Sequence, residues 1–475
     1  MMPRAHSGAA ARGARLGVGA LLTLAAMPIP GRAQTIGMRG WAGTTIQAVE
    51  MRPLAQVAGG CIEGEPCYLP AGEQLSLIGT QDVSLTAWGF GVEGLSATLY
   101  MRGRAGLGSD FVWPRSEDHF DALLGYAQWI RSGWTVRLGR QEIRSGLGFA
   151  SFDGASAGWR VGTWNVEGYG GRSLARGLRD PAYKALEGLE DFLPDQNVYL
   201  FGGSARGRVF GVTGTLRYQR EILADRSGLA AERASFDAAT TLPRVSLAGG
   251  IDWDFGRQQP GKGHLTASSP FGGGRWMASV SARRYVPYFS LSTIWGFFEP
   301  VAYHEAMARV GWSATTSLGL WASGGWRLYG DTETTTVLRA LEDTGWRGEA
   351  GAAWSFSPMW TVDGSYRVEW GPGGYLSSGD GALRWSPSDR YSLAVTGTAF
   401  QQIEQYRLGD GRAYGAGFTF DAGLTSRVTF VGGASMIRHS VKGDGVESPW
   451  NQARGWSTLR IAIGRDAGRA NRMRR

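Results

Sequence analysis

The sequence predicts an all-β fold in which one antiparallel sheet closes into a single transmembrane β-barrel of about 18 to 22 strands. Three observations support this prediction. Apolar and polar residues alternate along most of the 475 residues, no linker divides the chain, and Gly (74 residues) and Trp (20 residues) are abundant. Outside the N-terminus no apolar run approaches the roughly 18 residues of a membrane-spanning helix. A bundle of transmembrane helices is therefore excluded.

Residues 1–33 are expected to be a secretory signal peptide. Three Arg residues precede a short apolar stretch, Leu16–Met27, and small residues lead to Ala33, after which cleavage is expected. Cleavage would lower the formal net charge from +8 to +4, because four Arg and no Asp or Glu are removed. The basic balance thus gives no reason to expect a nucleic-acid partner. Residues 34–466 then form the barrel, and residues 467–475 form a basic tail.

The alternation is clearest in the segment "WTVDGSYRVEW". Val362 and Tyr366 lie on one face of this expected strand and Asp363, Arg367 and Glu369 on the other, because successive side chains in a strand point to opposite faces. A second strand places apolar Val245, Leu247 and Ile251 on one face and Asp252 and Asp254 on the other. Each strand therefore has an apolar face and a charged face.

An exported chain of such strands is typical of a bacterial outer-membrane β-barrel. In hydrocarbon every backbone polar group must be paired within the protein, and a closed barrel does this without a free edge. The apolar face would then contact outer-membrane lipid, and the polar face would line a wet interior. Aromatic residues near strand ends are expected at the membrane interfaces; these are Trp88, Trp134, Trp295, Trp360 and Trp370.

The barrel is expected to have short periplasmic turns and long extracellular loops. Short turns are predicted at "FGVEG", "IRSG", "RVGT", "SARGR", "TLPR", "YVPY", "WSATTS", "FSPM", "WSPSD" and "DAGLTS". The loops between them are predicted at 51–74, 106–118, 172–194, 256–273, 331–344, 371–378, 404–411 and 440–451. The segment "YFSLSTIWGFF" (288–298) is expected to be a strand, because Phe and Leu alternate with Ser in it.

Residues 136–173 resemble the alginate-export type of outer-membrane barrel. Members of that family tend to have a Gly-Arg-Gln strand end, then Phe-Asp-Gly, then a hairpin with Trp and Tyr. The matching residues are Gly139, Arg140, Gln141, Phe152, Asp153 and Gly154. The resemblance covers less than a tenth of the chain and implies barrel membership, but it does not imply alginate as the solute. The last strand, "GWSTLRIAIG", departs from common outer-membrane barrels because the chain does not end in an aromatic residue.

The polar faces of the strands supply candidate pore-lining residues. They are Arg137, Arg217, Gln219, Asp252, Asp254, Arg283, Arg327, Asp363, Arg367 and Glu369. Acidic and basic groups that face each other across a lumen create a transverse field, which orients polar solutes and makes passage selective. Each residue could instead pair with a neighbouring strand and stabilise the wall.

Two further features suggest more specific chemistry. Cys61 and Cys67 flank a Gly and a Pro in the first long loop, and an exported compartment permits a disulfide between them. His304 and Glu305 are adjacent, but neighbouring residues on a strand point to opposite faces and do not form a metal or catalytic pair. The mature chain has only four scattered His, namely His119, His264, His304 and His439. No metal, cofactor or enzymatic activity is expected.

The preferred function is a passive or facilitated channel for small or oligomeric polar solutes. An outer-membrane hydrolase would need a Ser or Thr, a His and an orienting partner within reach, and such barrels have fewer strands. A structural or adhesive barrel would have a lumen blocked by an inward-folded loop. Residues 172–194 are the preferred blocker because helix-forming residues with a 3–4 spacing of apolar positions occur there. The oligomeric state stays open.

Overall fold

The computed structural model describes residues 36–51, 54–57, 67–70, 74–106, 119–174, 198–224, 228–286, 302–330, 344–371, 374–403, 410–443 and 446–464. The regular structure of this part of the chain is entirely β. Its strands are β1 (Gly37–Met51), β2 (Leu54–Val57), β3 (Cys67–Pro70), β4 (Gln74–Trp88), β5 (Leu95–Gly106), β6 (His119–Arg131), β7 (Trp134–Ser145), β8 (Gly148–Val161), β9 (Trp164–Ser173), β10 (Val198–Val209), β11 (Val212–Leu223), β12 (Leu229–Thr241), β13 (Ser246–Asp254), β14 (Gln259–Phe271), β15 (Trp276–Tyr285), β16 (Tyr303–Ser313), β17 (Leu318–Tyr329), β18 (Thr344–Ser357), β19 (Trp360–Gly371), β20 (Gly374–Ser388), β21 (Tyr391–Ile403), β22 (Asp410–Gly423), β23 (Val428–Gly443) and β24 (Val446–Ile463).

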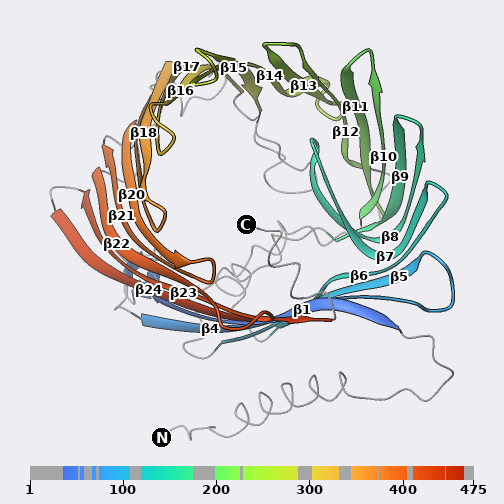
Figure 1. Cartoon of the computed structure of the whole chain (residues 1–475), viewed down its shortest axis with the longest axis horizontal. Helices are drawn as coiled ribbons and strands as arrows, with labels where there is room; N and C mark the ends of the chain where they lie inside the picture. Colours follow the sequence, from blue (N-terminus) through green and yellow to red (C-terminus); the bar gives the residue numbers. More distant parts are fainter. Residues whose placement is uncertain are drawn as a thin grey trace, which may run out of the picture.

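Twenty-two of these strands form one closed antiparallel barrel, which Figure 1 shows end-on. From β4 to β24 each strand pairs with its neighbours in sequence. β1 closes the ring, because Trp41 lies across from Ala462 of β24 and from Ser84 of β4. β2 and β3 pair only with each other. The predicted fold class is confirmed, at the upper end of the expected range of strand number.

Short turns gather at one end of the barrel, as predicted, but several predicted turns and loops are misplaced. Strands occupy most of the expected loops 371–378 and 440–451, because β20 begins at Gly374, β23 ends at Gly443 and β24 begins at Val446. "SARGR" lies within β10, and the turn falls at Phe210 and Gly211. "YVPY" begins at the last residue of β15, at the opposite end of the barrel, and the expected loop 256–273 contains β14. Because β14 is present, the connections between successive strands still alternate between the two ends of the barrel. The segment 288–298 lies outside the described residues.

The tightest turns follow backbone rules. Ser132 and Phe210 have φ of 48°, and the glycines after them, Gly133 and Gly211, have φ of 87° and 84°. Two successive positive φ values define the type I′ turn, whose twist matches that of a two-stranded hairpin. Gly is the residue that reaches this conformation without strain. The sequence thus favours a two-residue connection at both positions.

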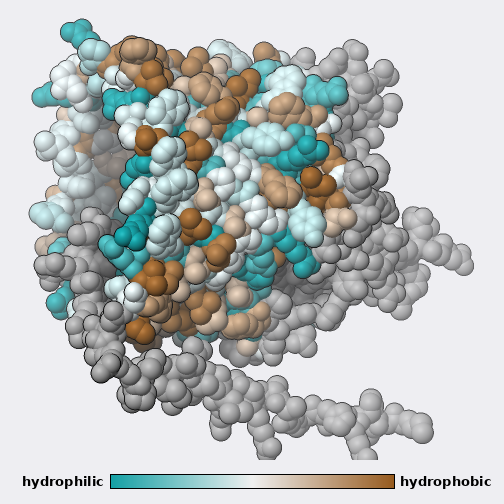
Figure 2. Space-filling model, turned by 90° about the vertical axis from the view of Figure 1, so that its right-hand side faces the viewer, coloured by the Kyte–Doolittle hydropathy of each residue, from teal (hydrophilic) through white to brown (hydrophobic). Residues whose placement is uncertain are grey.

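The two faces of the wall differ in burial. Across β11, β12 and β13, the cross-strand partners Leu216, Phe236 and Ile251 are 55%, 50% and 54% exposed. Ser235 and Asp252, on the opposite face of the same strands, are 6% and 5% exposed. Apolar side chains are spread over the outer face of the wall, with polar ones among them (Figure 2). The apolar face is therefore the outer face, as a membrane barrel requires.

Aromatic rings stack at the short-turn end of the barrel. Trp276 and Trp312 have ring centroids 5.2 Å apart, and Trp134 and Trp159 have theirs 5.5 Å apart. Amphipathic rings are suited to the depth of the lipid headgroups. Of the predicted interface residues, Trp88, Trp134, Trp360 and Trp370 lie at or next to strand ends, and Trp295 lies outside the described residues. None of the described residues belongs to a helix long and apolar enough to span a bilayer.

Candidate functional site: the inner wall and its inward hairpin

The ten predicted lining residues share the polar face of the wall. Register shows this, because residues directly across from each other lie on the same face. Arg217 lies across from Ser235, and Ser235 lies across from Asp252. The same cross-strand pairing, followed from strand to strand, places the other members of the set on this face. They are Arg137, Gln219, Asp254, Arg283, Arg327, Asp363, Arg367 and Glu369. The structure therefore places the set on one continuous inner face, and their role in lining an open pore stays a prediction.

Glu305 is the centre of the densest charge cluster on this face. Its side chain is 1% exposed and accepts hydrogen bonds from Arg283 at 3.0 Å, Arg327 at 2.7 Å and Arg347 at 2.6 Å. Arg327 also donates to Glu369. Three guanidinium groups thus share two carboxylates on β15–β19. Three Arg and two Glu give the cluster a formal net charge of +1.

Tyrosine rings complete this cluster at its long-loop end. Arg283 donates to the Tyr303 hydroxyl at 3.0 Å, and the guanidinium groups of Arg283 and Arg327 lie 5.4 Å and 5.0 Å from the Tyr303 ring centroid. Cation–π contacts of this kind hold a guanidinium in a fixed orientation while leaving other donors free. The alternation of the strands predicts Arg283 and Arg327 as lining residues but does not single out Glu305, which the sequence presents only as the neighbour of His304.

A second cluster lies on β11–β13. Arg217 donates to Asp237, and Arg233 donates to Asp252 at 2.6 Å with both side chains largely buried. Asp252 also accepts the backbone N–H of Lys262. Asp252 therefore binds both the Arg233 side chain and the backbone of β14, so its charge stabilises the wall in addition to facing the interior.

The remaining predicted residues lie outside these two clusters. Arg137 donates to Gln128 at 2.7 Å, Gln219 donates to Glu221 at 3.0 Å, and Arg367 lies 3.5 Å from Glu349. Asp254 accepts the backbone N–H of Arg257 at 3.1 Å. Asp363 lies across from Ala353 and Ala382. Arg367 is the most accessible of the paired arginines in the set, with 51% of its side chain exposed.

The β7–β8 hairpin leaves the wall and folds into the barrel. β7 pairs with β6 only as far as Arg140, and β8 pairs with β9 only as far as Phe152, so the residues between them pair only with each other. In Figure 1 this hairpin lies inside the ring of strands and reaches toward β12. The sequence does not predict this inward hairpin, and it predicts residues 172–194 as the inward-folded segment instead. Of those, only 172–174 are described.

The motifs at 139–141 and 152–154 meet at the point where the hairpin bends. Gly139 lies across from Gly154, Arg140 from Asp153, and Gln141 from Phe152. Arg140 and Asp153 form two parallel hydrogen bonds of 2.7 Å and 2.8 Å. Gly139 has φ of 123°, a conformation that residues with a Cβ rarely adopt.

Three further hydrogen bonds hold the bend. Arg140 donates to the carbonyl of Ala122 on β6 at 2.9 Å, where the β6–β7 ladder ends. Gln141 is 2% exposed, accepts from Ser156 at 2.7 Å and donates to the carbonyl of Gly154. The two motifs therefore form a hinge, in which glycine allows the bend and an ion pair fixes its direction.

Beyond the hinge, the hairpin packs one face on the inner wall. Ala150, Phe152 and Ile143 pack against Leu200 of β10 and Tyr169 of β9, and Phe152 and Leu200 are fully buried. The opposite face carries Glu142, Arg144 and Phe149, with Arg144 76% exposed by its side chain. This small hydrophobic core fixes the hairpin against the wall.

The tip of the hairpin docks on the second charge cluster. Arg233 donates to the carbonyl of Leu147 at 2.8 Å. At Gly146 a Cβ would lie 3.3 Å from Asp237 Oδ2 and 3.4 Å from Arg217 Nη1, so the tip contacts both members of that ion pair. One side of the barrel interior is thereby narrowed by a charged hairpin.

Other predicted features have these positions. His304 and Glu305 face opposite sides of the wall, as predicted, with His304 beside Arg284 on the outer face. Cys67 lies across from Val57 in the β2–β3 pair, and Cys61 lies outside the described residues, so the disulfide stays a prediction. Within the described ranges no group of three or more His, Cys, Asp or Glu could hold a metal ion. Residues 1–33 and the tail 467–475 also lie outside them.

Comparison with known proteins yields structural likeness only. No family model matches the chain, and no curated protein sequence matches it. The siderophore receptor PirA of Pseudomonas aeruginosa is similar to it with a TM-score of 0.51 at 10% identity, covering 89% of this chain and 80% of that one. The ferric enterobactin receptor PfeA of the same organism gives a TM-score of 0.53 at 11% identity, over 89% and 81%.

A weaker likeness extends to OpdQ of Pseudomonas aeruginosa, with a TM-score of 0.39 at 8% identity over 90% of this chain and 97% of that one. At these identities the two receptors establish the fold and leave the solute open. Together with the closed ring of strands and its apolar outer face, they show that this chain has the fold of a bacterial outer-membrane β-barrel.

Proposed function

We propose that the chain forms a channel that passes small or oligomeric polar solutes across the bacterial outer membrane. The observation that carries this proposal is the continuous polar inner face, on which nine of the ten predicted residues lie between β11 and β19 and several of them form charge clusters. Barrels of about 16 to 18 strands already leave an aqueous channel, and 22 strands enclose a wider lumen.

The inner wall would act on solutes through fixed charge. Arg283, Arg327 and Arg347 lie on one side of the interior, and the charged face of the β7–β8 hairpin lies inside the ring. A solute passing between them experiences opposed donors and acceptors, which favours polar and charged molecules over apolar ones. The channel is therefore proposed to be porin-like or exopolysaccharide-export-like.

The alginate-export resemblance supports the second of these descriptions. Its Gly-Arg-Gln and Phe-Asp-Gly motifs form the hinge that turns a hairpin into the lumen, so they bear on the width of the channel. This support concerns the architecture of the constriction. The class of solute rests on the mixed charge of the wall alone.

Charge reversal at Arg367 tests the proposal. The purified protein in a planar bilayer should give stable ohmic conductance steps, and Arg367→Glu should shift ion preference toward cations, because Arg367 is half-exposed on the inner face. Arg217 is a poorer choice because it contacts the hairpin tip. The matched control is Arg390→Glu in a short turn, which should leave the preference unchanged.

A second candidate function is a structural or adhesive barrel with a closed lumen, which the inward-folded hairpin favours. The same bilayer experiment separates the two functions. Correctly assembled protein that gives no conductance, in the wild type and after release of the hairpin, would overturn the channel and favour the closed barrel.

A further inference from the structure

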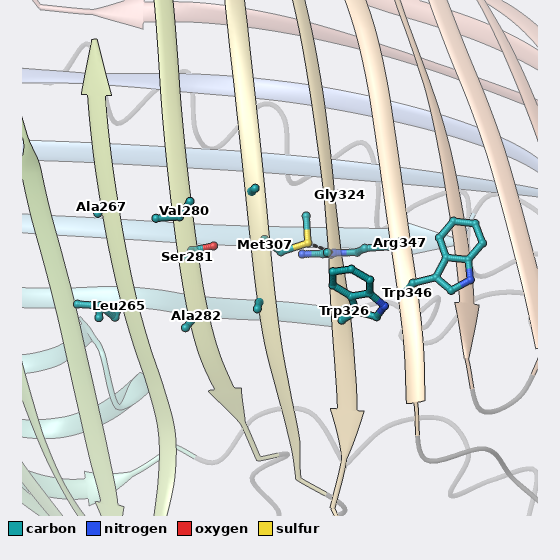
Figure 3. Close-up of a pocket in the computed structure, with 13 residues that line it drawn as sticks. Leu265, Ala267, Val280, Ser281, Ala282, Met307, Gly324, Trp326, Trp346 and Arg347 are labelled. Atoms are coloured by element: carbon teal, nitrogen blue, oxygen red, sulfur yellow. Dashed lines mark hydrogen bonds between the residues drawn. The ribbon is translucent and has the colours of Figure 1, made fainter. Parts of the chain in front are cut away.

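An apolar groove runs along the outer face of β14–β18. It has a volume of about 890 Å³, and Figure 3 shows Leu265 on one side of it and Gly324 and Trp326 on the other. Ala306 and Ala308 of β16 lie across from Trp326 and Gly324 and also line the groove. Trp326 is 71% exposed and Leu265 is 60% exposed, so the groove opens on the lipid-facing side. Because three adjacent strands carry alanine or glycine here, the groove is a property of the wall itself.

A pair of basic side chains lies at the long-loop end of this groove. Arg284 and His304 are cross-strand partners, two residues along their strands from Ala282 and Ala306. Arg284 Nη1 lies 3.1 Å from His304 Nε2. Arg284 Nε is buried and has no hydrogen-bond partner among the described residues. The pair therefore has donor capacity that the wall does not use.

Among the residues that the structure describes, no carboxylate faces this pair on the outer surface. The cross-strand partners at the same level are Gly263, Leu328 and Thr344, and Glu305 next to His304 points to the inner face. The Arg284 guanidinium lies beside hydrocarbon without a counter-ion from these described neighbours, which is costly, so an anionic group is expected there.

We propose that this groove and basic pair form a binding site for a phosphate-bearing lipid of the membrane leaflet at the long-loop end. One acyl chain lies in the groove, and a headgroup phosphate accepts hydrogen bonds from Arg284 and His304. Charge-assisted hydrogen bonds from a guanidinium to phosphate are strong and directional. The site depends on the fold and does not require that the lumen conducts.

A second copy of the chain fits this surface less well than a lipid does. A symmetric pair of barrels would place Arg284 of both copies on the same interface, where the two guanidinium charges repel. A lipid instead supplies both the apolar chain and the negative charge that the surface lacks. Trp326 and Trp346, cross-strand partners beside the groove, are suited to the interface depth at which that headgroup would lie.

Native mass spectrometry with a bis-phosphorylated lipid A as the probe tests the site. The wild type should retain lipid A through detergent exchange, and Arg284→Ser combined with His304→Gln should reduce retention at least tenfold. Gly324→Leu should reduce it as well by filling the groove, because a Cβ at Gly324 has room, with its nearest neighbour at 3.8 Å. The matched control is Arg438→Ser, an exposed arginine beside the outward-facing Tyr414 on β22 and β23.

Three outcomes would overturn the proposal. Equal retention by the wild type and the Arg284→Ser/His304→Gln variant shows that the pair does not bind phosphate. Equal retention of dephosphorylated lipid A shows a purely apolar groove. Oligomers of the wild type that dissociate in Gly324→Leu show that another copy fills the groove. Correct folding of each variant is checked by heat-modifiable migration on gels, so that loss of lipid A from an unfolded variant is not taken for loss of the site.

Discussion

At the residue scale, Glu305 shows how the wall stabilises its charge. The carboxylate is buried and accepts hydrogen bonds from Arg283, Arg327 and Arg347. Hydrogen bonds between ionised partners are roughly twice as strong as neutral ones, and the loss of one buried partner leaves the others uncompensated. Glu305 is therefore the residue on which the arrangement of three arginines depends.

Replacing Glu305 by Gln should destabilise the barrel and change its selectivity. We expect the free energy of unfolding to fall by about 1–3 kcal/mol. This is less than the usual cost of breaking a fully buried ion pair, because the arginines that contact Glu305 are partly exposed. Unfolding by urea in lipid vesicles measures this fall. Ion preference should shift toward anions, because three arginines then face a neutral amide.

The control for this change is Glu349→Gln. Its partner Arg367 is half-exposed and 3.5 Å away, so the cost should be no more than about 1 kcal/mol. Equal losses in the two variants would show that the arginine cluster has no special dependence on Glu305.

The sequence predicts which residues share the charged face but not how they pair. The alternation at Asp363, Arg367 and Glu369 is readable because the strand period is two. Pairing depends on register between strands far apart in sequence, as for Arg327 with Glu369. For this reason Arg347 and Glu305 were not among the predicted residues.

At the element scale, the β7–β8 hairpin is the part of the wall that changes the interior. The sequence predicts the turn at "RVGT" between β8 and β9, but it does not predict the β7–β8 hairpin. Its inward direction depends on Leu200 and Arg233, both far along the chain, so no local pattern reveals it. β14 was missed for a different reason, since Pro260 and its neighbouring glycines resemble a loop, and the strand forms through pairing with β13 and β15.

Removing the docking pair should release the hairpin tip. Arg233→Ser with Asp252→Ser removes both charges together, so neither remains buried alone. We expect a larger single-channel conductance and faster tryptic cleavage after the exposed Arg144. The control is Arg102→Ser with Asp82→Ser, an inner-wall pair at 2.8 Å that does not touch the hairpin.

A cross-link provides the reverse test. Gly146→Cys and Ser235→Cys place two thiols within reach, because a Cβ at Gly146 would lie 3.6 Å from Ser235 Oγ. The oxidised protein should keep the conductance of the wild type, since the docked hairpin is the ground state. A large drop in conductance on oxidation would contradict this, because it would mean that the hairpin tip of the wild type is not docked while the channel conducts.

At the scale of the whole molecule, the barrel separates lipid from its polar interior, because alternate residues of each strand face one or the other. Spin labels at Val362 and Asp363, adjacent residues of β19, should report opposite accessibilities. The label at position 362 should be accessible to oxygen from the bilayer, and the label at 363 to a polar nickel reagent from water. Equal accessibility of both labels would contradict the assignment of the two faces.

Ring closure has a kinetic consequence. Gly40 lies across from Ile463, so the last ladder of the barrel joins residues separated by almost the whole described chain. Until β24 arrives, β1 and β23 each keep an unpaired edge, and such edges invite aggregation with other chains. Contacts this distant in sequence also form slowly, because the loop between them must be ordered first. Biogenesis of this protein should therefore need a chaperone or insertion partner that holds both open edges apart until the final strand is delivered.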